Sequence, residues 1–445
     1  MTPGAHYQAA IEILEAFKTS RLPLDAFLDQ WSRSHRFAGS KDRTAIKEIV
    51  YTVMRRRAEF VWHMGSEQPR ALVLAQLALE TLVPLDAARD LFDGNGYNPA
   101  PLTDAEAERY QKIGHSKSDP VPEPIRANYP EWLKTEFSFP KGSDASKEWQ
   151  AMSRRATVDV RVNTLKKDRD AVMEELARQG IEMRPCPYSG IGLRMDQAGA
   201  STRFINLRSQ RVFKSGWVEL QDEGAQIAAL LVDAQPKHQV LDLCAGVGGK
   251  TLAMAATMEN SGQIFAADIN QRRLNRMKPR LHRAGAHNVQ LLPLAKKWLS
   301  AGDPILDEFS GHFDRVLLDV PCSGTGAWRR NPDAKWRLTP DHLGDYVARQ
   351  REILERAMPL VKPGGRLIYV TCSLLARENQ AQISGFLAAH EEFCGLSTAK
   401  IAGQSRHVAG DGLMTAGAKL ADYLLLSPAT TATDGTFIAV LERHA

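Results

Sequence analysis

Two cysteines follow stretches of apolar residues that are typical of buried β-strands. Cys322 lies in DVPCSGTG (319–326), just after the expected strand 315–319, and Cys372 lies in VTCS (370–373), just after the expected strand 366–371. A single unpaired cysteine is most often a small buried hydrophobe. Two thiols at the ends of neighbouring strands instead favour covalent catalysis, with one thiol as the nucleophile. Their spacing alone does not decide which thiol has that role.

An acidic residue, Asp319, comes three positions before Cys322. A carboxylate at the end of a strand can stabilise a loop by accepting hydrogen bonds from backbone N–H groups. It can also act as a proton donor if burial raises its pKa. Both interpretations stay open from the residues alone.

A glycine-rich turn lies upstream, in VLDLCAGVGGKT (240–251). It joins an apolar strand to an apolar helix, so backbone N–H groups at the helix start are free to bind a ligand that approaches the glycines closely. Asp268 ends the next apolar run, where a doubly wound sheet places an acid that holds a ribose hydroxyl. This arrangement predicts a site for an adenosine cofactor.

Two other nucleotide-binding motifs fit the turn less well. The phosphate-binding loop of NTPases requires glycine where Cys244 stands, and a dinucleotide fingerprint requires a third glycine where Thr251 stands. The apolar strand before Asp319 could still imitate the magnesium-binding strand of an NTPase. Nucleotide hydrolysis therefore remains an alternative.

Two basic segments lie near these motifs in the sequence. Residues 327–337 interleave two tryptophans with basic side chains, and residues 272–283 are rich in arginine and contain no acid. Aromatic rings beside cations bind single-stranded RNA by stacking and charge attraction. Either segment alone is more often a solvated helix face, but together they favour a nucleic-acid partner.

The elements that must position these groups alternate between strand and helix from residue 217 onward. Strands are expected at 240–243, 263–268, 289–292, 315–319, 366–371, 423–426 and 437–441. This alternation predicts a mostly parallel, Rossmann-like α/β sheet that binds ligands at the carboxyl ends of its strands. The last two strands, joined without a clear helix, are expected to form an antiparallel hairpin at one edge.

Three further segments precede this domain (217–445), so the fold is multidomain. Residues 1–92 carry apolar side chains at helical spacing and predict an all-α bundle. Residues 93–150 are rich in Pro, Gly, Asn and Asp and are expected to be a linker with a docking segment at 129–133. Residues 151–216 predict a small α+β domain, with strands at 158–162 and 191–195 and a helix at 168–179.

Composition limits the class of protein further. The 445 residues, 43% of them apolar and 24% charged, are enough for several globular cores. The five cysteines contain no CxxC pair, which argues against a disulfide framework or a bound metal and suits a reducing cytoplasm. With no apolar run of membrane-spanning length and no signal peptide, we expect a cytoplasmic protein without a membrane partner. A net charge of +5 permits a nucleic-acid partner.

Three of these motifs resemble, in order and spacing, those of the RNA cytosine-5 methyltransferases of the Fmu/Sun (Nop-Sun) type: VLDLCAGVGGKT (240–251), LLDVPCSGTGAWRRNPD (317–333) and YVTCSLLARENQAQI (369–383). The resemblance continues upstream through LQDEGAQIAALLV (220–232), VDVRVNTLKK (158–167) and YPEWL (129–133). SKDRTAIKEIVYTVMRRR (40–57) is similar to the NusB-like RNA-binding domain of the bacterial ribosomal small-subunit enzymes of this kind, and DGTF (434–437) to the family's closing strand.

The resemblance implies a class I methyltransferase sheet with S-adenosylmethionine as its cofactor. It implies that Asp268 binds the ribose, that Asp319 lies nearby in the catalytic set, and that the cofactor loop consists of Cys244, Ala245, Gly246, Val247, Gly248, Gly249 and Lys250. It assigns Cys372 as the nucleophile that adds to C6 of cytosine and Cys322 as the residue that assists product release. The expected substrate is RNA, ribosomal or transfer RNA, with the target base splayed out of its stack and the enzyme a monomer.

The sequence departs from the family pattern in three places. Gly246 and Val247 stand where many members have Ala-Pro, and Ala376 and Arg377 replace a common Pro-Glu. Residues 291–297 (LLPLAKK) lack the acid that usually contacts the adenine. An RNA-binding protein on a methyltransferase scaffold, with weak or lost cofactor binding, is therefore the alternative to an active enzyme.

Overall fold

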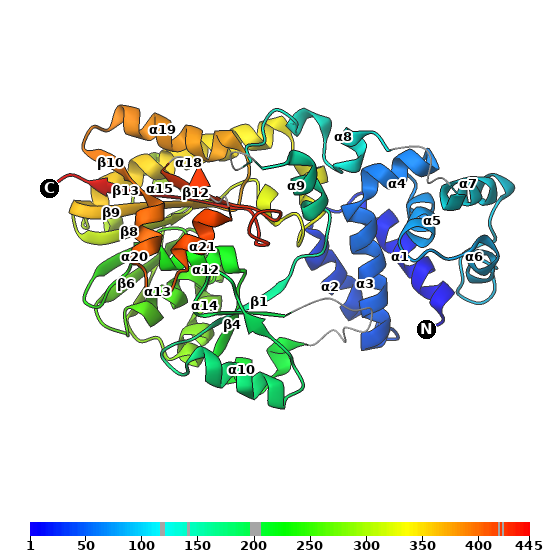
Figure 1. The fold of residues 1–445 in the computed structure, drawn as a ribbon, viewed down its shortest axis with the longest axis horizontal. Helices are drawn as coiled ribbons and strands as arrows, with labels where there is room; N and C mark the ends of the chain where they lie inside the picture. Colours follow the sequence, from blue (N-terminus) through cyan, green and yellow to red (C-terminus); the bar gives the residue numbers. More distant parts are fainter. Residues whose placement is uncertain (116–120, 140–142, 196–205, 417–418, 421) are drawn as a thin grey trace. The chain divides into compact units, whose positions relative to one another are not determined.

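The computed structural model describes residues 1–115, 121–139, 143–195, 206–416, 419–420 and 422–445 (Figure 1). The chain forms two compact units. The helical unit consists of Met1–Lys134, Trp149–Arg155 and Trp328–Arg337, and the sheet unit of Thr135–Glu148, Ala156–Ala327 and Leu338–Ala445.

The helical unit is built around α5 (Pro69–Leu79), whose residues are buried almost throughout because it is apolar on all sides. Its core also takes buried side chains from α1 and α3, among them Ile13 and Val50. The first helix begins where the Thr2 side chain accepts a hydrogen bond from the Ala5 N–H. The helices of this part of the chain are α1 (Pro3–Phe17), α2 (Leu24–Ser34), α3 (Ser40–Arg55), α4 (Arg57–Met64), α5, α6 (Leu85–Leu91), α7 (Asp104–His115) and α8 (Glu123–Arg126).

The segment expected to be a linker contributes to this core. Ala107, Tyr110 and Ile113 form a buried stripe at helical spacing on α7, and the Tyr110 hydroxyl donates a hydrogen bond to the Val83 carbonyl oxygen at 2.8 Å. The prolines and glycines that suggested a linker flank this stripe. Two of the prolines, Pro120 and Pro140, lie outside the described residues. The domain boundaries predicted at residues 92, 150 and 216 stay predictions.

The segment 328–337, which includes α17 (Ala334–Arg337), packs within the helical unit. The Trp336 indole N–H donates to the Met54 carbonyl oxygen at 2.8 Å, and the Lys335 ammonium donates to the Arg55 carbonyl oxygen at 2.7 Å. Trp328 and Lys335 are buried. The prediction that this segment offers open rings and cations to RNA is therefore wrong for Trp328 and Lys335, which are buried, and the polar groups of Trp336 and Lys335 bind the end of α3.

In the sheet unit, a small antiparallel sheet has the strand order β2-β3-β1-β4. Arg194 of β3 binds both carboxylate oxygens of Asp159 on β1, at 2.7 and 2.8 Å, and one oxygen of Glu223 on α12 at 3.1 Å. All three side chains are buried, so the ion cluster fixes the small sheet to α12. The elements are β1 (Val158–Val162), α10 (Arg169–Arg178), β2 (Arg184–Pro185), β3 (Gly192–Met195), α11 (Arg211–Lys214), β4 (Val218–Leu220) and α12 (Glu223–Leu230). Residues 196–205 of the predicted α+β domain lie outside the described residues.

The large sheet has the order β11-β12-β13-β9-β8-β5-β6-β7, with β10 also paired to β13. Strands β5 to β9 are parallel, and β13 runs antiparallel to both β9 and β12, as the predicted terminal hairpin requires. The strands are β5 (Gln239–Asp242), β6 (Gln263–Asp268), β7 (Val289–Pro293), β8 (Phe313–Asp319), β9 (Val361–Thr371), β10 (Phe393–Leu396), β11 (Lys419–Leu420), β12 (Tyr423–Leu426) and β13 (Thr436–Arg443).

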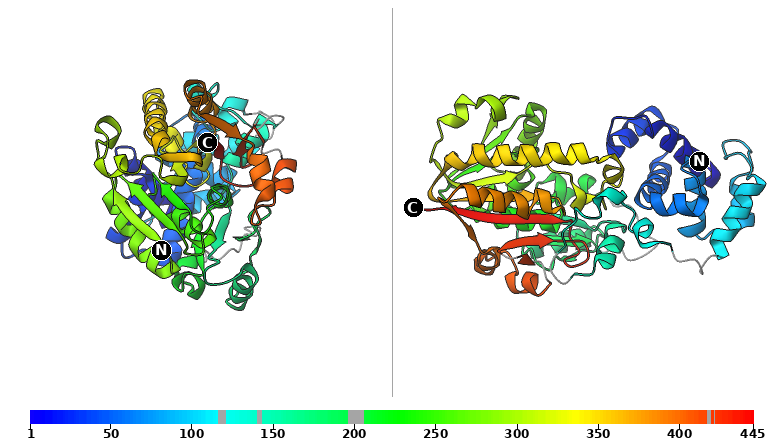
Figure 2. Two further views of the ribbon diagram at one scale, coloured as in Figure 1. Left: turned by 90° about the vertical axis from the view of Figure 1, so that its left-hand side faces the viewer. Right: turned by 90° about the horizontal axis from the view of Figure 1, so that it is seen from above.

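Helices pack along this sheet. Helices α13 and α14 pack on β6, and α18 packs beside α19, which Figures 1 and 2 show as two neighbouring rods. Within the described residues every helix is too short or too polar to cross a lipid bilayer. The helices of the rest of the chain are α9 (Ala145–Met152), α13 (Gly249–Thr257), α14 (Gln271–Ala284), α15 (Trp298–Ala301), α16 (Pro304–Asp307), α18 (Pro340–Ala357), α19 (Gln380–Ala389), α20 (Thr398–Gln404) and α21 (Gly410–Thr415).

The register of the parallel strands brings the predicted site residues to one edge. Asp242 pairs with Ala266 on one side and Leu317 on the other, and Asp319 pairs with Val370. The loops that follow β5, β6, β8 and β9 therefore leave the sheet at the same end. This is the edge at which open α/β sheets bind their ligands.

Candidate active site

The glycine turn connects the end of β5 to the start of α13. Gly248 has a φ of +83°, and a Cβ atom there would come within 2.5 Å of the Met277 side chain. Only glycine meets both conditions without strain. Gly246, with a φ of +58°, donates its N–H to Asp268 at 2.9 Å, and a Cβ added to it would meet open space.

Asp268 ends β6 directly beside this turn. Its Oδ2 accepts the Gly246 N–H, and its Oδ1 accepts the Asn270 N–H at 2.6 Å at the start of α14. The carboxylate is 7% exposed and is held in place by the two backbone donors. The structure thus places Asp268 where the sequence predicted it, next to the glycine loop.

Two arginines bind carbonyl oxygens of the glycine loop, and the sequence analysis did not predict this role for either of them. The Arg161 guanidinium, on β1, donates to the Gly249 carbonyl oxygen at 2.6 Å, and Arg280, on α14, donates to the Val247 carbonyl oxygen at 2.5 Å. Arg280 and Arg283 also form ion pairs with Glu219 of β4. The available sign of this role was the presence of a cation, Arg161, in the predicted strand VDVRV (158–162).

The Glu219 ion pairs change the interpretation of the basic segment 272–283. Arg280 and Arg283 are bound within the sheet unit and are not open to RNA. Arg272, Arg273, Arg276 and Lys278 are exposed on α14. The exposed part of the predicted RNA surface is therefore confined to these four side chains of the segment.

The acid inside β5, Asp242, supports the loop structurally. Its Oδ2 accepts a hydrogen bond from the Thr251 hydroxyl at 2.6 Å, and burial raises its pKa from 3.8 to about 7. The pKa of Cys244 is also raised well above its ordinary value, first by burial and then by the negative charge of Asp268 and Asp319. A thiol in that state is a poor nucleophile, so Cys244 serves the loop and not the chemistry.

Lys250 and Asp319 form an ion pair between the loop and the cysteines. The Lys250 ammonium lies 2.6 Å from Asp319 Oδ2, with the lysine side chain 12% exposed and the aspartate 37%. Burial alone would lower the pKa of Lys250, but the Asp319 carboxylate and, after it, the charge of Cys372 raise that pKa above its ordinary value. Lys250 is therefore cationic at neutral pH and within electrostatic reach of Cys372. Asp319 is thus bound to the cofactor loop through Lys250.

The two cysteines come together at the carboxyl ends of β8 and β9. Their sulfur atoms lie 3.3 Å apart, and the Gly326 N–H donates to the Cys372 carbonyl oxygen at 2.9 Å. Cys372 is exposed and Cys322 is partly buried. The hydrogen bond with Cys372, and then burial, hold the pKa of Cys322 well above its ordinary value. Cys322 therefore keeps its proton at neutral pH and can donate it toward the Cys372 sulfur.

A buried glutamate ties the two cysteine loops together, which the sequence did not reveal. Glu378 has no exposed surface, and its carboxylate accepts hydrogen bonds from the Ser323 N–H at 2.8 Å, from Gln350 Nε2 at 3.0 Å and from the Ser373 hydroxyl at 2.5 Å. The Ser323 hydroxyl donates to the same carboxylate. Ser323 and Ser373 directly follow the two cysteines, so Glu378 fixes the backbone on both sides of the thiol pair.

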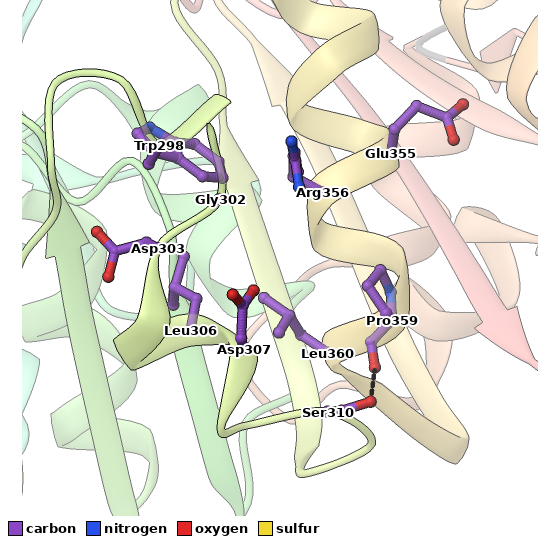
Figure 3. Close-up of a pocket in the computed structure, with 10 residues that line it drawn as sticks. All are labelled: Trp298, Gly302, Asp303, Leu306, Asp307, Ser310, Glu355, Arg356, Pro359 and Leu360. Carbon is purple, nitrogen blue, oxygen red and sulfur yellow. Dashed lines mark hydrogen bonds between the residues drawn. The ribbon is translucent and has the colours of Figure 1, made fainter. Parts of the chain in front are cut away.

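The segment after β7 lacks the acid expected there, and Asp303, from further along the chain, binds this segment instead. Asp303 accepts hydrogen bonds from the Ala295 N–H at 2.9 Å and the Ile305 N–H at 3.1 Å, so both of its oxygens bind backbone. It also lines a pocket of about 240 Å³ with Trp298, Leu306 and Arg356 (Figure 3). Ser310 and Pro359 of this pocket precede β8 and β9, so it lies at the opposite end of these strands from the cysteines.

The parallel sheet carries a glycine loop after β5, an acid at the end of β6, and two facing thiols after β8 and β9. This arrangement defines a Rossmann-like cofactor-binding fold with a dithiol site. Comparison with known proteins agrees. A family model described as 16S rRNA methyltransferase RsmB/F matches residues 229–442, and one described as the ferredoxin-like domain of RsmF/B-like methyltransferases matches residues 129–202.

Relatives match across most of the chain. A Synechocystis protein named probable ribosomal RNA small subunit methyltransferase B is 30% identical over 411 residues, which are 87% of this chain and 90% of that protein. Ribosomal RNA small subunit methyltransferase B of Photorhabdus laumondii is 34% identical over 284 residues, 62% of this chain and 60% of that protein. The chain belongs to the RsmB/F family of rRNA methyltransferases, whose cofactor is S-adenosylmethionine.

Solved structures support the same fold. The crystal structure of PH0851 matches with a TM-score of 0.74 and 26% identity, over 100% of this chain and 99% of that one. The structure of NSun6 from Pyrococcus horikoshii with SFG matches with a TM-score of 0.56 and 19% identity, over 68% of this chain and 94% of that one. At this identity, the match supports only a shared fold. The family resemblance, the fold class and the cofactor predicted from the sequence are confirmed.

Proposed function

We propose that the protein methylates C5 of a cytosine in RNA, through a covalent bond between Cys372 and C6 of the base. The observation that carries this proposal is the pair of sulfur atoms 3.3 Å apart at the strand ends beside the cofactor loop. Small-subunit ribosomal RNA is the proposed substrate, because the relatives are named for it.

The residues around the glycine loop fit S-adenosylmethionine. The open space at Gly246 leaves the main chain accessible beside the Asp268 carboxylate, which can accept hydrogen bonds from the ribose hydroxyls. Residues 244–250 would hold the rest of the cofactor, with Lys250 kept in place by Asp319. When bound, the cofactor supplies an electrophilic methyl group on a sulfonium.

The chemistry of cytosine explains why a thiol is needed. C5 of cytosine is too weakly nucleophilic to accept a methyl group directly. Addition of the Cys372 thiolate to C6, with protonation at N3, converts C5 into a nucleophilic enamine carbon. The Lys250 ammonium, which Asp319 holds in place, lies within electrostatic reach of the Cys372 sulfur.

Product release requires elimination of the Cys372 sulfur from C6 after the methyl group has been transferred. A base must remove the proton from C5, after which the bond between C6 and the Cys372 sulfur breaks. We assign assistance in this release to Cys322, whose sulfur lies next to that of Cys372 and whose proton can pass to the Cys372 sulfur as that sulfur leaves C6. Asp319 acts through Lys250 as a positioning residue.

The second candidate function is RNA binding on a methyltransferase scaffold without transfer. It is favoured by a single observation, which is that Asp303, the acid that reaches the end of β7, has both oxygens bound to backbone N–H groups. Calorimetry with S-adenosylmethionine separates the two functions, because the scaffold protein would bind the cofactor weakly or not at all.

The test of the proposal is transfer of a labelled methyl group from S-adenosylmethionine to total cellular RNA, followed by nucleoside analysis and mapping of the site. The expected product is 5-methylcytidine in small-subunit ribosomal RNA, absent with the Cys372→Ala variant. Label in transfer RNA would change the substrate and keep the chemistry. Label in another nucleoside, or cofactor binding without any transfer, would overturn the proposal.

A further inference from the structure

The two site cysteines are close enough to bond to one another. Their sulfur atoms lie 3.3 Å apart, whereas the sulfur atoms of a disulfide lie about 2.05 Å apart. The two side chains would have to bring the sulfur atoms about 1.3 Å closer for the bond to form.

The backbone on both sides is held in a geometry that suits this bond. Ser323 and Ser373, the next residues along the chain, have hydroxyl oxygens 3.3 Å apart, and both bind the buried Glu378. The Val320 N–H donates to the Val370 carbonyl oxygen at 3.1 Å, which continues the pairing of β8 and β9 toward the thiols. Bonding of the sulfurs therefore requires no separation of these segments.

We propose that Cys322 and Cys372 form a redox switch, in which a hydroperoxide converts them to an intramolecular disulfide that stops methyl transfer. Formation of the disulfide does not depend on the proposed function, and only the loss of activity rests on it. The oxidised protein would lack the nucleophile, because the Cys372 sulfur is then bonded to Cys322.

The oxidation occurs in two balanced steps. The Cys372 thiolate attacks one oxygen of the hydroperoxide, the O–O bond breaks, and the other oxygen takes up a proton and leaves as water or an alcohol. The Cys322 sulfur then attacks the resulting sulfenic acid, the S–S bond forms, and the hydroxyl leaves as water with the proton of Cys322. Two thiols are oxidised and one peroxide is reduced, and a thiol reductant reverses the reaction by exchange.

Exposure and charge favour Cys372 as the first sulfur to react. Cys372 is exposed and lies within reach of the Lys250 cation, as oxidant-sensitive thiols do. Cys186, in contrast, is buried, and burial raises its pKa above the ordinary value. The pair at the strand ends is therefore more open to oxidation than Cys186.

The experiment is titration of the full-length protein with hydrogen peroxide, followed by thiol blocking, trypsin digestion and mass spectrometry. Trypsin releases Cys322 in residues 316–329 and Cys372 in residues 367–377, each with a single cysteine. We expect these peptides linked, lighter than their sum by two hydrogen atoms and separable by dithiothreitol. The free thiols should fall from the five of the reduced chain to three, and methyl transfer should be lost and then restored by the reductant.

Two variants serve as controls. Cys394→Ser, which changes a cysteine on β10, should still form the linked peptides. Cys322→Ser should form no linked peptides and should instead accumulate a sulfenic acid on Cys372 that reacts with dimedone. The proposal is overturned if peroxide leaves the wild-type peptides unlinked, or links Cys372 to any other cysteine. Linked peptides in a protein that methylates no RNA would overturn the proposed function and leave the redox pair intact.

Discussion

Replacement of Glu378 by alanine should slow methyl transfer without weakening cofactor binding. The glutamate carboxylate accepts hydrogen bonds from residues next to both cysteines but has none to the glycine loop. Alanine would leave four donated hydrogen bonds without an acceptor in a buried place. Each such loss costs about 1–3 kcal/mol, so the two loops should move to recover some of it.

The size of the effect follows from the need for precise placement of the nucleophile. A shift of about 1 Å at a reacting group can cost on the order of 100-fold in rate, and we expect Glu378→Ala to lower kcat by about that factor. Glu378→Gln should cost about tenfold or less, because an amide loses only the charge of the acceptor. Its oxygen can accept the fixed N–H donors of Ser323 and Gln350, while its NH₂ group faces two serine hydroxyls that can rotate to accept.

The assay combines single-turnover methyl transfer with calorimetry of S-adenosylmethionine. The matched control is Glu355→Ala, which removes a partly exposed glutamate from α18 whose partner is His390. It should leave both measurements unchanged. Transfer of methyl groups by Glu378→Ala at the wild-type rate, or transfer by Glu378→Gln as slow as that of the alanine variant, would contradict the role assigned to Glu378.

Three further predictions concern the cofactor, the helical unit and RNA. Asp268→Ala should weaken S-adenosylmethionine binding about ten- to hundredfold, because one charge-assisted hydrogen bond is worth about 1.5–3 kcal/mol; unchanged affinity by calorimetry would reject the assignment. Burial lowers the pKa of Lys335 from 10.5 to about 7, so its charge destabilises the fold fully below pH 7 and progressively less as the pH rises toward 10.5. Lys335→Met should therefore raise the Tm at pH 7 and raise it less at pH 10, and a gain that does not shrink with pH would contradict the cause. Charge reversal at Arg272, Arg273 and Arg276 should weaken RNA binding and reduce its salt slope by about 0.7 for each lost phosphate contact; an unchanged slope would exclude α14 from the RNA surface.

The sequence predicted the parts of the site that follow from local pattern. Alternating strands and helices placed the glycine loop, Asp268 and the two cysteines at strand ends, and parallel strands put such ends side by side. The 3.3 Å approach of the two sulfurs follows from that topology together with the pairing of β8 and β9. The buried supports were beyond this reasoning, because Glu378 and Arg161 show no local sign of the distant groups that they bind.

The segment 328–337 shows the same limit in another form. Tryptophans among basic residues look alike in sequence whether they face RNA or a helix end. Trp336 and Lys335 bind carbonyl oxygens at the end of α3, which lies far away along the chain. No local window contains both partners, so the burial of Lys335 could be found only from the fold.

Covalent catalysis by the two cysteines is tested most directly by measuring RNA methylation and covalent protein–RNA complexes with the Cys372→Ala and Cys322→Ala variants. Cys372→Ala lacks the nucleophile and should neither methylate RNA nor form a covalent complex with it. Cys322→Ala should add to the base and transfer the methyl group but stall before release, which leaves a protein–RNA complex that survives denaturing electrophoresis. Unmodified enzyme should form a similar complex with RNA that contains 5-fluorocytosine, because that C5 cannot lose a proton. If Cys372→Ala accumulates the complex and Cys322→Ala does not, the assigned roles are reversed, and if both variants methylate RNA normally, the covalent mechanism is wrong.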